Sequence, residues 1–131
     1  MSNPSRVLVV DDNHLIRRLL DMVLSGAGYV PVEAESAEEA LAIGTADPPD
    51  AWIVDHEMPG TKGDVLVRAL RASPDPRLSG AAVIGISAHP GAEWALRSAG
   101  VTAFVSKPVE ERELLEVLAR ALGGTPPHAP V

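Results

Sequence analysis

Four short segments of the sequence carry side chains that could do chemistry together, because each directly follows a short apolar run of strand character. In order along the chain they are Asp11-Asp12, Asp55, Ser87 and Lys107-Pro108. In an open parallel sheet, the carboxyl ends of the strands face one crevice, where ligands bind. We therefore expect three carboxylates, a hydroxyl and an ammonium group to meet at one edge of a sheet.

Such a set of groups is typical of a site for Mg²⁺ and a phosphoryl group. Mg²⁺ prefers oxygen ligands and is bound by carboxylates together with phosphate oxygens and water. The pair Asp11-Asp12 is ambiguous by itself, since one aspartate could cap the following helix while the other is solvated. Asp55 adds a third carboxylate and favours the metal site. Asp55 could then attack phosphorus, while Mg²⁺ and Lys107 neutralise charge on the phosphoryl oxygens and Ser87 donates a hydrogen bond.

The composition narrows the class of protein. The chain has 131 residues, of which 46% are hydrophobic, enough for one domain with a real core. Its formal net charge of −7 would repel nucleic acid, so we expect no nucleic-acid partner. Absence of cysteine excludes disulfides and thiolate metal sites, and suits a reducing compartment. No apolar stretch approaches the ~20 residues of a bilayer span, so we expect no membrane partner and a cytoplasmic location.

Apolar runs alternate with helical patterns five times, which predicts an α/β domain with a parallel sheet over residues 1–122. The expected strands are Arg6–Val10, Tyr29–Ala34, Ala51–Asp55, Ala81–Ser87 and Val101–Ser106. The expected helices cover about residues 14–25, 36–44, 64–72, 90–100 and 109–122. Pro31 predicts an edge position for the second strand, and residues 73–80 are expected to form a loop. Residues 123–131 are expected to be a flexible tail rich in proline and glycine.

The helical patterns also predict which side chains are buried. The first helix has an apolar stripe expected to face the core, made of Ile16, Leu19, Leu20 and Val23. Leu15 and Met22 fall off this stripe. Trp94, on the fourth helix, is expected to be partly buried in the core. His56 is interpreted as a solvent-facing loop residue.

Four motifs, taken together, resemble those of a known family. They are V-L-V-V-D-D-N, I-V-D-H-E-M-P-G-T-K-G, I-G-I-S-A and A-F-V-S-K-P, and they occur in this order over about residues 5–122. Order and spacing resemble the receiver domain of two-component response regulators, in the CheY-like superfamily. The resemblance implies a flavodoxin-like (βα)5 fold, in which the doubly wound parallel sheet has strand order 2-1-3-4-5.

The resemblance also implies a role for each residue of the acidic pocket. Asp55 is the phosphoacceptor, which takes a phosphoryl group from a histidine of a sensor histidine kinase or a histidine phosphotransfer protein. Mg²⁺ is bound by Asp12, Asp55 and the backbone carbonyl of Glu57, while Asp11 completes the pocket through water. Lys107 contacts the phosphoryl group, and its peptide bond to the following proline, Lys107-Pro108, is cis.

A second set of implied roles concerns the response to phosphorylation. Ser87 follows the phosphoryl group inward and Phe104 rotates with it, which shifts the population between two states. Glu57 and His89 occupy positions that tune the lifetime of the acyl phosphate.

The first helix of such domains packs against the helical bundle of the phosphodonor. Leu15 and Met22 are therefore either an exposed docking patch or rim residues of the core. The resemblance implies a phosphoacceptor switch rather than an enzyme, since such a domain promotes only its own phosphorylation and dephosphorylation. We expect the receiver to stand alone, because only about nine residues follow the last expected helix. Its output is contact with a downstream protein. The alternative is a receiver fold that takes no phosphate and only binds a partner.

Three other classes of protein explain the sequence less well. A flavodoxin needs a phosphate loop rich in serine, threonine and glycine after the first strand, where this chain has Asp11-Asp12. An aspartyl phosphatase places its nucleophile after the first strand, whereas Asp55 follows the third. A Toprim-like nuclease gives no role to Ser87 or Lys107-Pro108.

Overall fold

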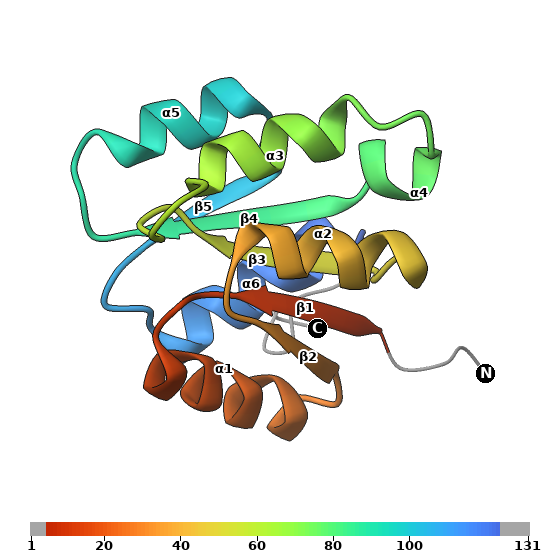
Figure 1. Ribbon diagram of the computed structural model, residues 1–131. Coiled ribbons are helices and arrows are strands. Elements are labelled where there is room, and N and C mark those ends of the chain that lie inside the picture. Colours follow the sequence, from red (N-terminus) through yellow and green to blue (C-terminus); the bar gives the residue numbers. More distant parts are fainter. Residues whose placement is uncertain (1–4, 124–131) are drawn as a thin grey trace.

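The strands of the computed structural model form one five-stranded parallel sheet, and the structure describes residues 5–123. The strands are β1 Arg6–Val10, β2 Val30–Ala34, β3 Ala51–Asp55, β4 Ala82–Ser87 and β5 Ala103–Ser106 (Figure 1). Their order is β2-β1-β3-β4-β5, and every neighbouring pair is parallel. This confirms the expected doubly wound fold, and it places β2 with Pro31 at an edge, where a missing backbone N–H is tolerated.

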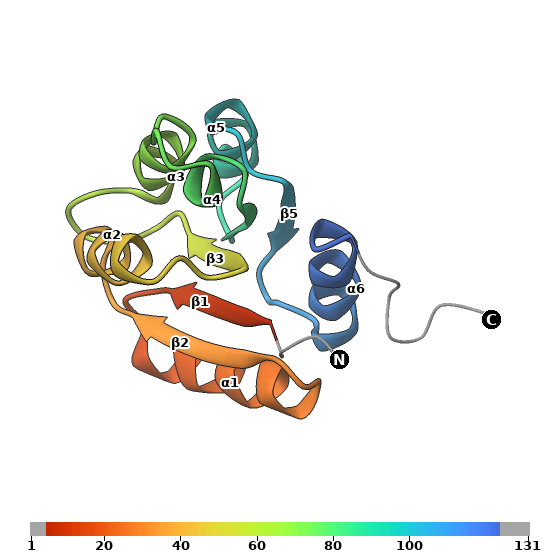
Figure 2. The same cartoon turned by 90° about the vertical axis from the view of Figure 1, so that its right-hand side faces the viewer.

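Helices cover both faces of the sheet, as Figures 1 and 2 show. They are α1 His14–Gly26, α2 Ala37–Ala46, α3 Gly63–Arg71, α4 Pro76–Ser79, α5 Ala92–Ala99 and α6 Glu111–Ala121. Side chains of α1 and α6 share one core cluster, while those of α2, α3 and α5 share the other. Alternate residues of β1 enter opposite clusters: Leu8 belongs to the cluster that includes α2 and α3, and Val9 to the cluster that includes α1 and α6.

Most predicted bounds agree with the structure to within two residues, but the expected loop over residues 73–80 contains the short helix α4. Its N-cap is Asp75, whose side chain accepts a hydrogen bond from the backbone N–H of Arg77 at 2.9 Å. Pro76 follows at the first helical position, where its fixed φ suits a helix start. The signals for this helix were therefore present in a segment dominated by loop-forming residues.

Two predictions of burial were wrong. Trp94 is 76% exposed, because α5 buries Ala92, Leu96 and Ala99, and Trp94 projects from the opposite side of the helix. Leu19 is 54% exposed, since the face of α1 that packs on the sheet is instead set by Leu20, Leu24 and the aliphatic part of a buried arginine, Arg17. A helix with apolar residues on several sides leaves its core-facing direction open until its neighbours are known.

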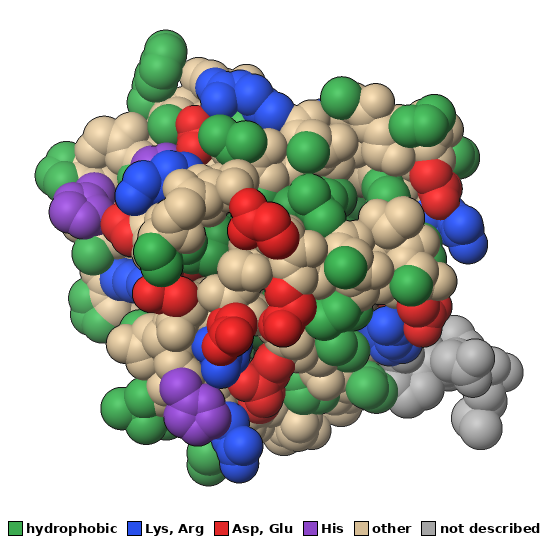
Figure 3. Space-filling view, in the orientation of Figure 1, with side chains coloured by type: hydrophobic (Ala, Val, Ile, Leu, Met, Phe, Trp, Pro, Cys, Tyr) green, Lys and Arg blue, Asp and Glu red, His purple; other side chains and the backbone are tan. Residues whose placement is uncertain are grey.

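Acidic side chains are unevenly distributed on the surface. Figure 3 shows them gathered over the part of the face where Figure 1 places α2, β2 and the start of α1. Glu35, Glu38 and Glu39 are exposed at the start of α2, where negative charge favours the helix dipole. Within residues 5–123, no helix has the length and apolar character that a bilayer crossing requires. The predicted tail lies outside the described residues, apart from Gly123.

One close contact between α2 and the sheet leaves no room for a larger residue. Gly44 of α2 lies against the indole of Trp52, a fully buried residue of β3, and a Cβ on Gly44 would overlap that ring. We predict that Gly44→Ala lowers the free energy of unfolding by about 1–3 kcal/mol in urea denaturation, because the fully buried ring would have to shift within a close-packed core.

The matched control is Gly26→Ala at the end of α1. A Cβ at Gly26 has none of the described atoms within 4 Å. Since alanine also restricts the unfolded chain, Gly26→Ala should leave stability unchanged or slightly higher. Equal losses in the two variants would contradict the packing argument.

Candidate functional site

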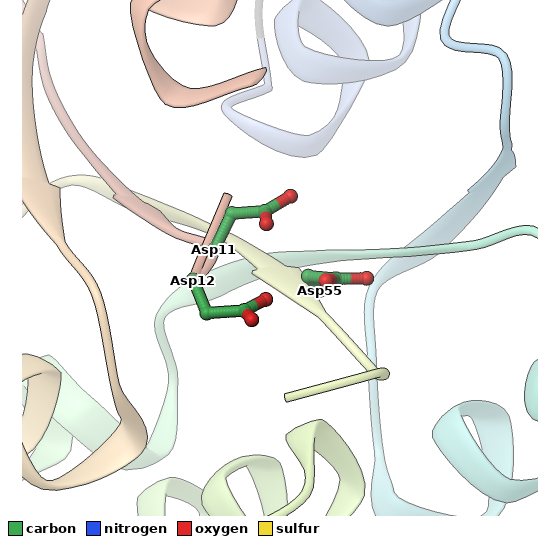
Figure 4. Close-up of side chains that lie close together, drawn as sticks. All are labelled: Asp11, Asp12 and Asp55. Atoms are coloured by element: carbon green, nitrogen blue, oxygen red, sulfur yellow. The ribbon is translucent and has the colours of Figure 1, made fainter. Parts of the chain in front are cut away.

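Three carboxylates meet at the carboxyl edge of the sheet (Figure 4). Asp11 and Asp12 directly follow β1, and Asp55 is the last residue of β3. Because Val10 of β1 pairs with Val54 of β3, the next residues of the two strands come side by side. One carboxylate oxygen of each aspartate lies within 4.8 Å of the others. Asp11 and Asp55 are buried, whereas Asp12 is exposed at the mouth of the cluster.

The turn after β1 is fixed by hydrogen bonds to its own polar groups. The backbone N–H of Asn13 donates to Asp11 Oδ1 at 2.9 Å. Asn13 is also the N-cap of α1, since its Oδ1 accepts from the backbone N–H of Ile16 at 3.1 Å. Neither aspartate is needed as the cap, so both carboxylates remain available to the cluster.

Lys107 supplies the positive charge of the site from the segment after β5. Its Nζ lies 3.1 Å from Asp55 Oδ1 and 3.6 Å from Asp11 Oδ2. The Lys107-Pro108 peptide bond is cis. Burial by itself lowers the pKa of Lys107, but the Asp55 and Asp11 carboxylates outweigh it and hold the pKa above its ordinary value. The lysine is therefore a permanent cation at this site.

One lysine does not balance this amount of negative charge. Burial and the neighbouring Asp11 carboxylate raise the pKa of Asp55 to about 6, and the charge of Lys107 offsets them only in part. Within the described part of the chain, Asp11 Oδ2 is buried and accepts no hydrogen bond. An oxygen-only donor set with excess negative charge and a buried carboxylate oxygen that accepts no hydrogen bond fits a hard divalent cation such as Mg²⁺.

Ser87 and Glu57 form the second part of the site. Ser87 ends β4 and is 1% exposed. Its hydroxyl donates to Glu57 Oε2 at 2.6 Å and accepts from the backbone N–H of His89 at 2.9 Å. Burial raises the pKa of Glu57, but the hydrogen bonds with Ser87 and His56 outweigh it and hold the pKa below its ordinary value. The serine predicted to meet a phosphoryl group is therefore bound to a carboxylate in this structure.

His56 was not expected to take part in this network. Its Nδ1 lies 3.0 Å from Glu57 Oε2, and its Nε2 lies 3.4 Å from Asp64 Oδ1 in the first turn of α3. The ring is half-buried rather than solvent-facing, so that prediction was wrong. The loop is compact because Gly63 packs directly on the backbone carbonyl of Asp55, where a Cβ would collide with it.

The remaining predicted residues lie on either side of this centre. Phe104 of β5 is half-buried and lines a pocket of about 150 Å³ together with Ser87 and His89. Leu15 and Met22 are 67% and 71% exposed on α1, which excludes their alternative interpretation as rim residues of the core. They adjoin an apolar groove of about 290 Å³ between α1 and the start of α6.

Comparison with known proteins agrees with this geometry. The model of the response regulator receiver domain matches residues 7–119. The chain belongs to this family. Receiver domains are signalling modules, and their fold is the one described above.

Individual relatives place the receiver domain in different contexts. This chain is 35% identical over 116 residues to the sensory/regulatory protein RpfC of Xanthomonas campestris pv. campestris. The match covers 87% of this chain and only 16% of RpfC. It is 26% identical over 120 residues to the polar-differentiation response regulator DivK of Brucella anthropi, a match that covers 92% of the chain and 98% of DivK. The solved structure of the chemotaxis response regulator CheY4 of Vibrio cholerae is similar with a TM-score of 0.82 and 28% identity, covering 90% of this chain and 98% of that one.

Arg17 is a residue of this receiver domain whose importance the sequence analysis missed. It is buried, its Nη1 donates to the backbone carbonyl of Asp11 at 2.7 Å, and its Nε donates to Glu33 Oε1 at 3.0 Å. It thus ties the turn of the acidic cluster to β2. Its spacing from Leu20 and Leu24 places it on the buried face of α1, a signal that the pattern of apolar residues alone does not show.

The carboxyl pair Asp21 and Glu33, of which Glu33 accepts a hydrogen bond from Arg17, should make the stability of the domain depend on pH. Burial, a hydrogen bond with Glu33 and the Glu33 charge raise the pKa of Asp21 from 3.8 to about 7. A raised folded-state pKa means that the contribution of Asp21 to stability is complete below about pH 4 and is lost as pH rises through about 7. The pKa of its partner Glu33 is lowered, mainly by the same hydrogen bond, so the Glu33 contribution is lost at the acid end instead.

We therefore predict that the stability advantage of the wild-type domain over Asp21→Asn shrinks as pH rises from about 4 to about 7, measured by urea denaturation at a series of pH values. The asparagine keeps the shape of the side chain but binds no proton. Parallel stability curves for the two proteins over this range would contradict the shared-proton arrangement.

Proposed function

We propose that this receiver domain is a Mg²⁺-dependent phosphoacceptor switch that takes a phosphoryl group onto Asp55 from a phosphohistidine. The observation that carries the proposal is the Asp55 carboxylate, buried at a strand end with two further carboxylates and with Lys107 Nζ 3.1 Å away. The donor is a sensor histidine kinase or a histidine phosphotransfer protein. Because such a donor receives its phosphoryl group from ATP, we propose that the reaction takes place in the cytoplasm.

The proposed transfer needs positioning and charge compensation more than covalent assistance. An Asp55 carboxylate oxygen forms the new bond to phosphorus as the bond from phosphorus to the histidine nitrogen breaks, and that nitrogen keeps the electron pair. Lys107 stabilises the negative charge of the phosphoryl oxygens. Mg²⁺, when bound, supplies further positive charge there. Asp12, Asp55 and the backbone carbonyl of Glu57 would hold the ion, with Asp11 acting through water.

The proposed output is a population shift driven by the phosphoryl group. Ser87 would donate to a phosphoryl oxygen, and the pocket of about 150 Å³ between Phe104 and Ser87 provides space for the ring to turn. Glu57 and His89 flank Ser87, which supports a role for both in the lifetime of the acyl phosphate. The changed surface would then bind a downstream protein.

Incubation with acetyl phosphate and Mg²⁺ tests the phosphoacceptor directly, with intact mass spectrometry as the measurement. We predict a single phosphoryl adduct that is absent in Asp55→Asn and suppressed by EDTA. Asp50→Asn is the matched control, because Asp50 is an exposed carboxylate immediately before the same strand, at its far end. This variant should keep the adduct.

Two results would go against the proposal. An adduct that survives Asp55→Asn would place the acceptor elsewhere. A wild-type protein that forms no adduct at any Mg²⁺ concentration would favour the alternative of a receiver fold that only binds a partner.

We also propose that the phosphodonor docks on α1. Leu15 and Met22 are exposed there, and the groove of about 290 Å³ beside them is lined by Ile16, Leu19 and Pro108, among others. The groove extends to Lys107, which touches Asp55. A helix packed on this surface would therefore bring a phosphohistidine close to the acceptor carboxylate.

Docking on α1 predicts a difference between protein and small-molecule donors. Met22→Glu should slow transfer from a phosphorylated histidine phosphotransfer protein or kinase by roughly tenfold, because it removes a large apolar contact from the interface. The rate from acetyl phosphate should not change. Trp94→Ala is the control, since Trp94 is also strongly exposed but lies on α5, on the other side of the sheet. Equal slowing with both donors, or in both variants, would count against the docking surface.

A further inference from the structure

The hydroxyl of Ser87 already donates one hydrogen bond and accepts another in this structure. A serine hydroxyl has one proton to donate. That proton goes to Glu57 Oε2 over 2.6 Å, while the backbone N–H of His89 donates to the same hydroxyl at 2.9 Å. With Ser87 only 1% exposed, the hydroxyl has no access to bulk water for a replacement partner.

The carboxylate that accepts this proton is held in place from its other side. His56 Nδ1 lies 3.0 Å from the same oxygen, Glu57 Oε2, and His56 Nε2 lies 3.4 Å from Asp64 Oδ1. The four side chains come from the loop after β3, the first turn of α3 and the end of β4. The chain Asp64–His56–Glu57–Ser87 therefore connects α3 to the strand end where a phosphoryl group on Asp55 would lie.

The Ser87 hydroxyl cannot donate its one proton to Glu57 and to a phosphoryl oxygen at the same time. A hydrogen bond to an ionised acceptor is stronger than one between neutral groups, so releasing Ser87 opposes the response to phosphate. The Glu57 side chain is 27% exposed, which leaves it a path toward solvent once the serine has gone.

We propose that Glu57 is a positioning residue that holds Ser87 in the unphosphorylated arrangement, so that a phosphoryl group must displace this carboxylate to recruit the hydroxyl. The proposal rests on the proposed function of Asp55 as the phosphoacceptor. It assigns Glu57 a role through its side chain, which is separate from the role of its backbone carbonyl toward the metal. It also makes Glu57 act through Ser87 and not simply through its charge.

A double-mutant cycle separates these two modes of action. The readout is the affinity for beryllofluoride, a non-covalent mimic of the phosphoryl group, measured by isothermal titration calorimetry with saturating Mg²⁺. Glu57→Ala is compared in the wild-type background and in a Ser87→Ala background, with unfolding curves to check that each variant folds. Glu57→Gln is the conservative variant, because its amide oxygen still accepts a hydrogen bond without the charge.

We expect Glu57→Ala to tighten beryllofluoride binding about tenfold in the wild-type background, and at most about twofold when Ser87 is absent. Glu57→Gln should lie between wild type and Glu57→Ala, since a neutral acceptor holds Ser87 less strongly. If the tightening is the same in both backgrounds, Glu57 acts only by repulsion and the inference is wrong. Tightening that is equal for Gln and Ala would also contradict it.

The same experiment distinguishes failure of this inference from failure of the proposed function. A wild-type protein that binds beryllofluoride, with binding lost in Asp55→Asn, retains the phosphoacceptor site whatever the cycle shows. A wild-type protein that does not bind it would overturn the proposed function, and the role of Glu57 with it.

Discussion

The site depends on one electrostatic constraint: buried carboxylates from two neighbouring strands end at the same place. The pairing of β1 with β3 brings Asp11 beside Asp55, and the turn after β1 adds Asp12. Burial disfavours a charged carboxylate and like charges in a buried site destabilise each other, and these two effects together raise the pKa of Asp55. The fold thus brings together carboxylates that repel one another, and a bound cation would relieve that repulsion.

The groups that stabilise this arrangement come from separate parts of the chain. Lys107 reaches in from the segment after β5, and Arg17 holds the backbone of Asp11 from within α1. Glu57 and Ser87 connect the loop after β3 to the end of β4. Side chains from several separate elements therefore hold the acidic cluster and its surroundings in place. The proposed phosphorylation switch would require contacts of this kind, because a change at Asp55 would then reach several elements at once.

The strands and the acidic cluster could be predicted because they follow from short-range patterns, whereas the strand order was expected only from the resemblance to receiver domains. An aspartate at the end of an apolar strand lies at the carboxyl edge of a parallel sheet, whichever strand it follows. The pattern of apolar runs was therefore enough to predict that Asp11 and Asp55 lie at the same edge. The network around Glu57 could not be predicted in this way. Its bond to Ser87 joins residues 30 positions apart and depends on side-chain rotamers that only the packed loop defines.

Errors at the surface have a related cause. Trp94 was expected to be partly buried, yet the buried face of α5 consists of two alanines and one leucine, Ala92, Leu96 and Ala99. Arg17 was overlooked for the opposite reason: a charged side chain can be buried when a backbone carbonyl and a carboxylate accept its hydrogen bonds. In both cases the partners across the interface decided the outcome, and helical periodicity carries no information about them.

The convergence of charge at the strand ends is tested most directly by locating a divalent ion. Crystals soaked in Mn²⁺, an anomalous scatterer that takes the same oxygen ligands as Mg²⁺, would reveal the ion in an anomalous difference map. We predict one strong peak bounded by the carboxylates of Asp12 and Asp55 and the backbone carbonyl of Glu57. An empty acidic pocket at saturating Mn²⁺, or a peak only at other carboxylates, would contradict this electrostatic origin of the site.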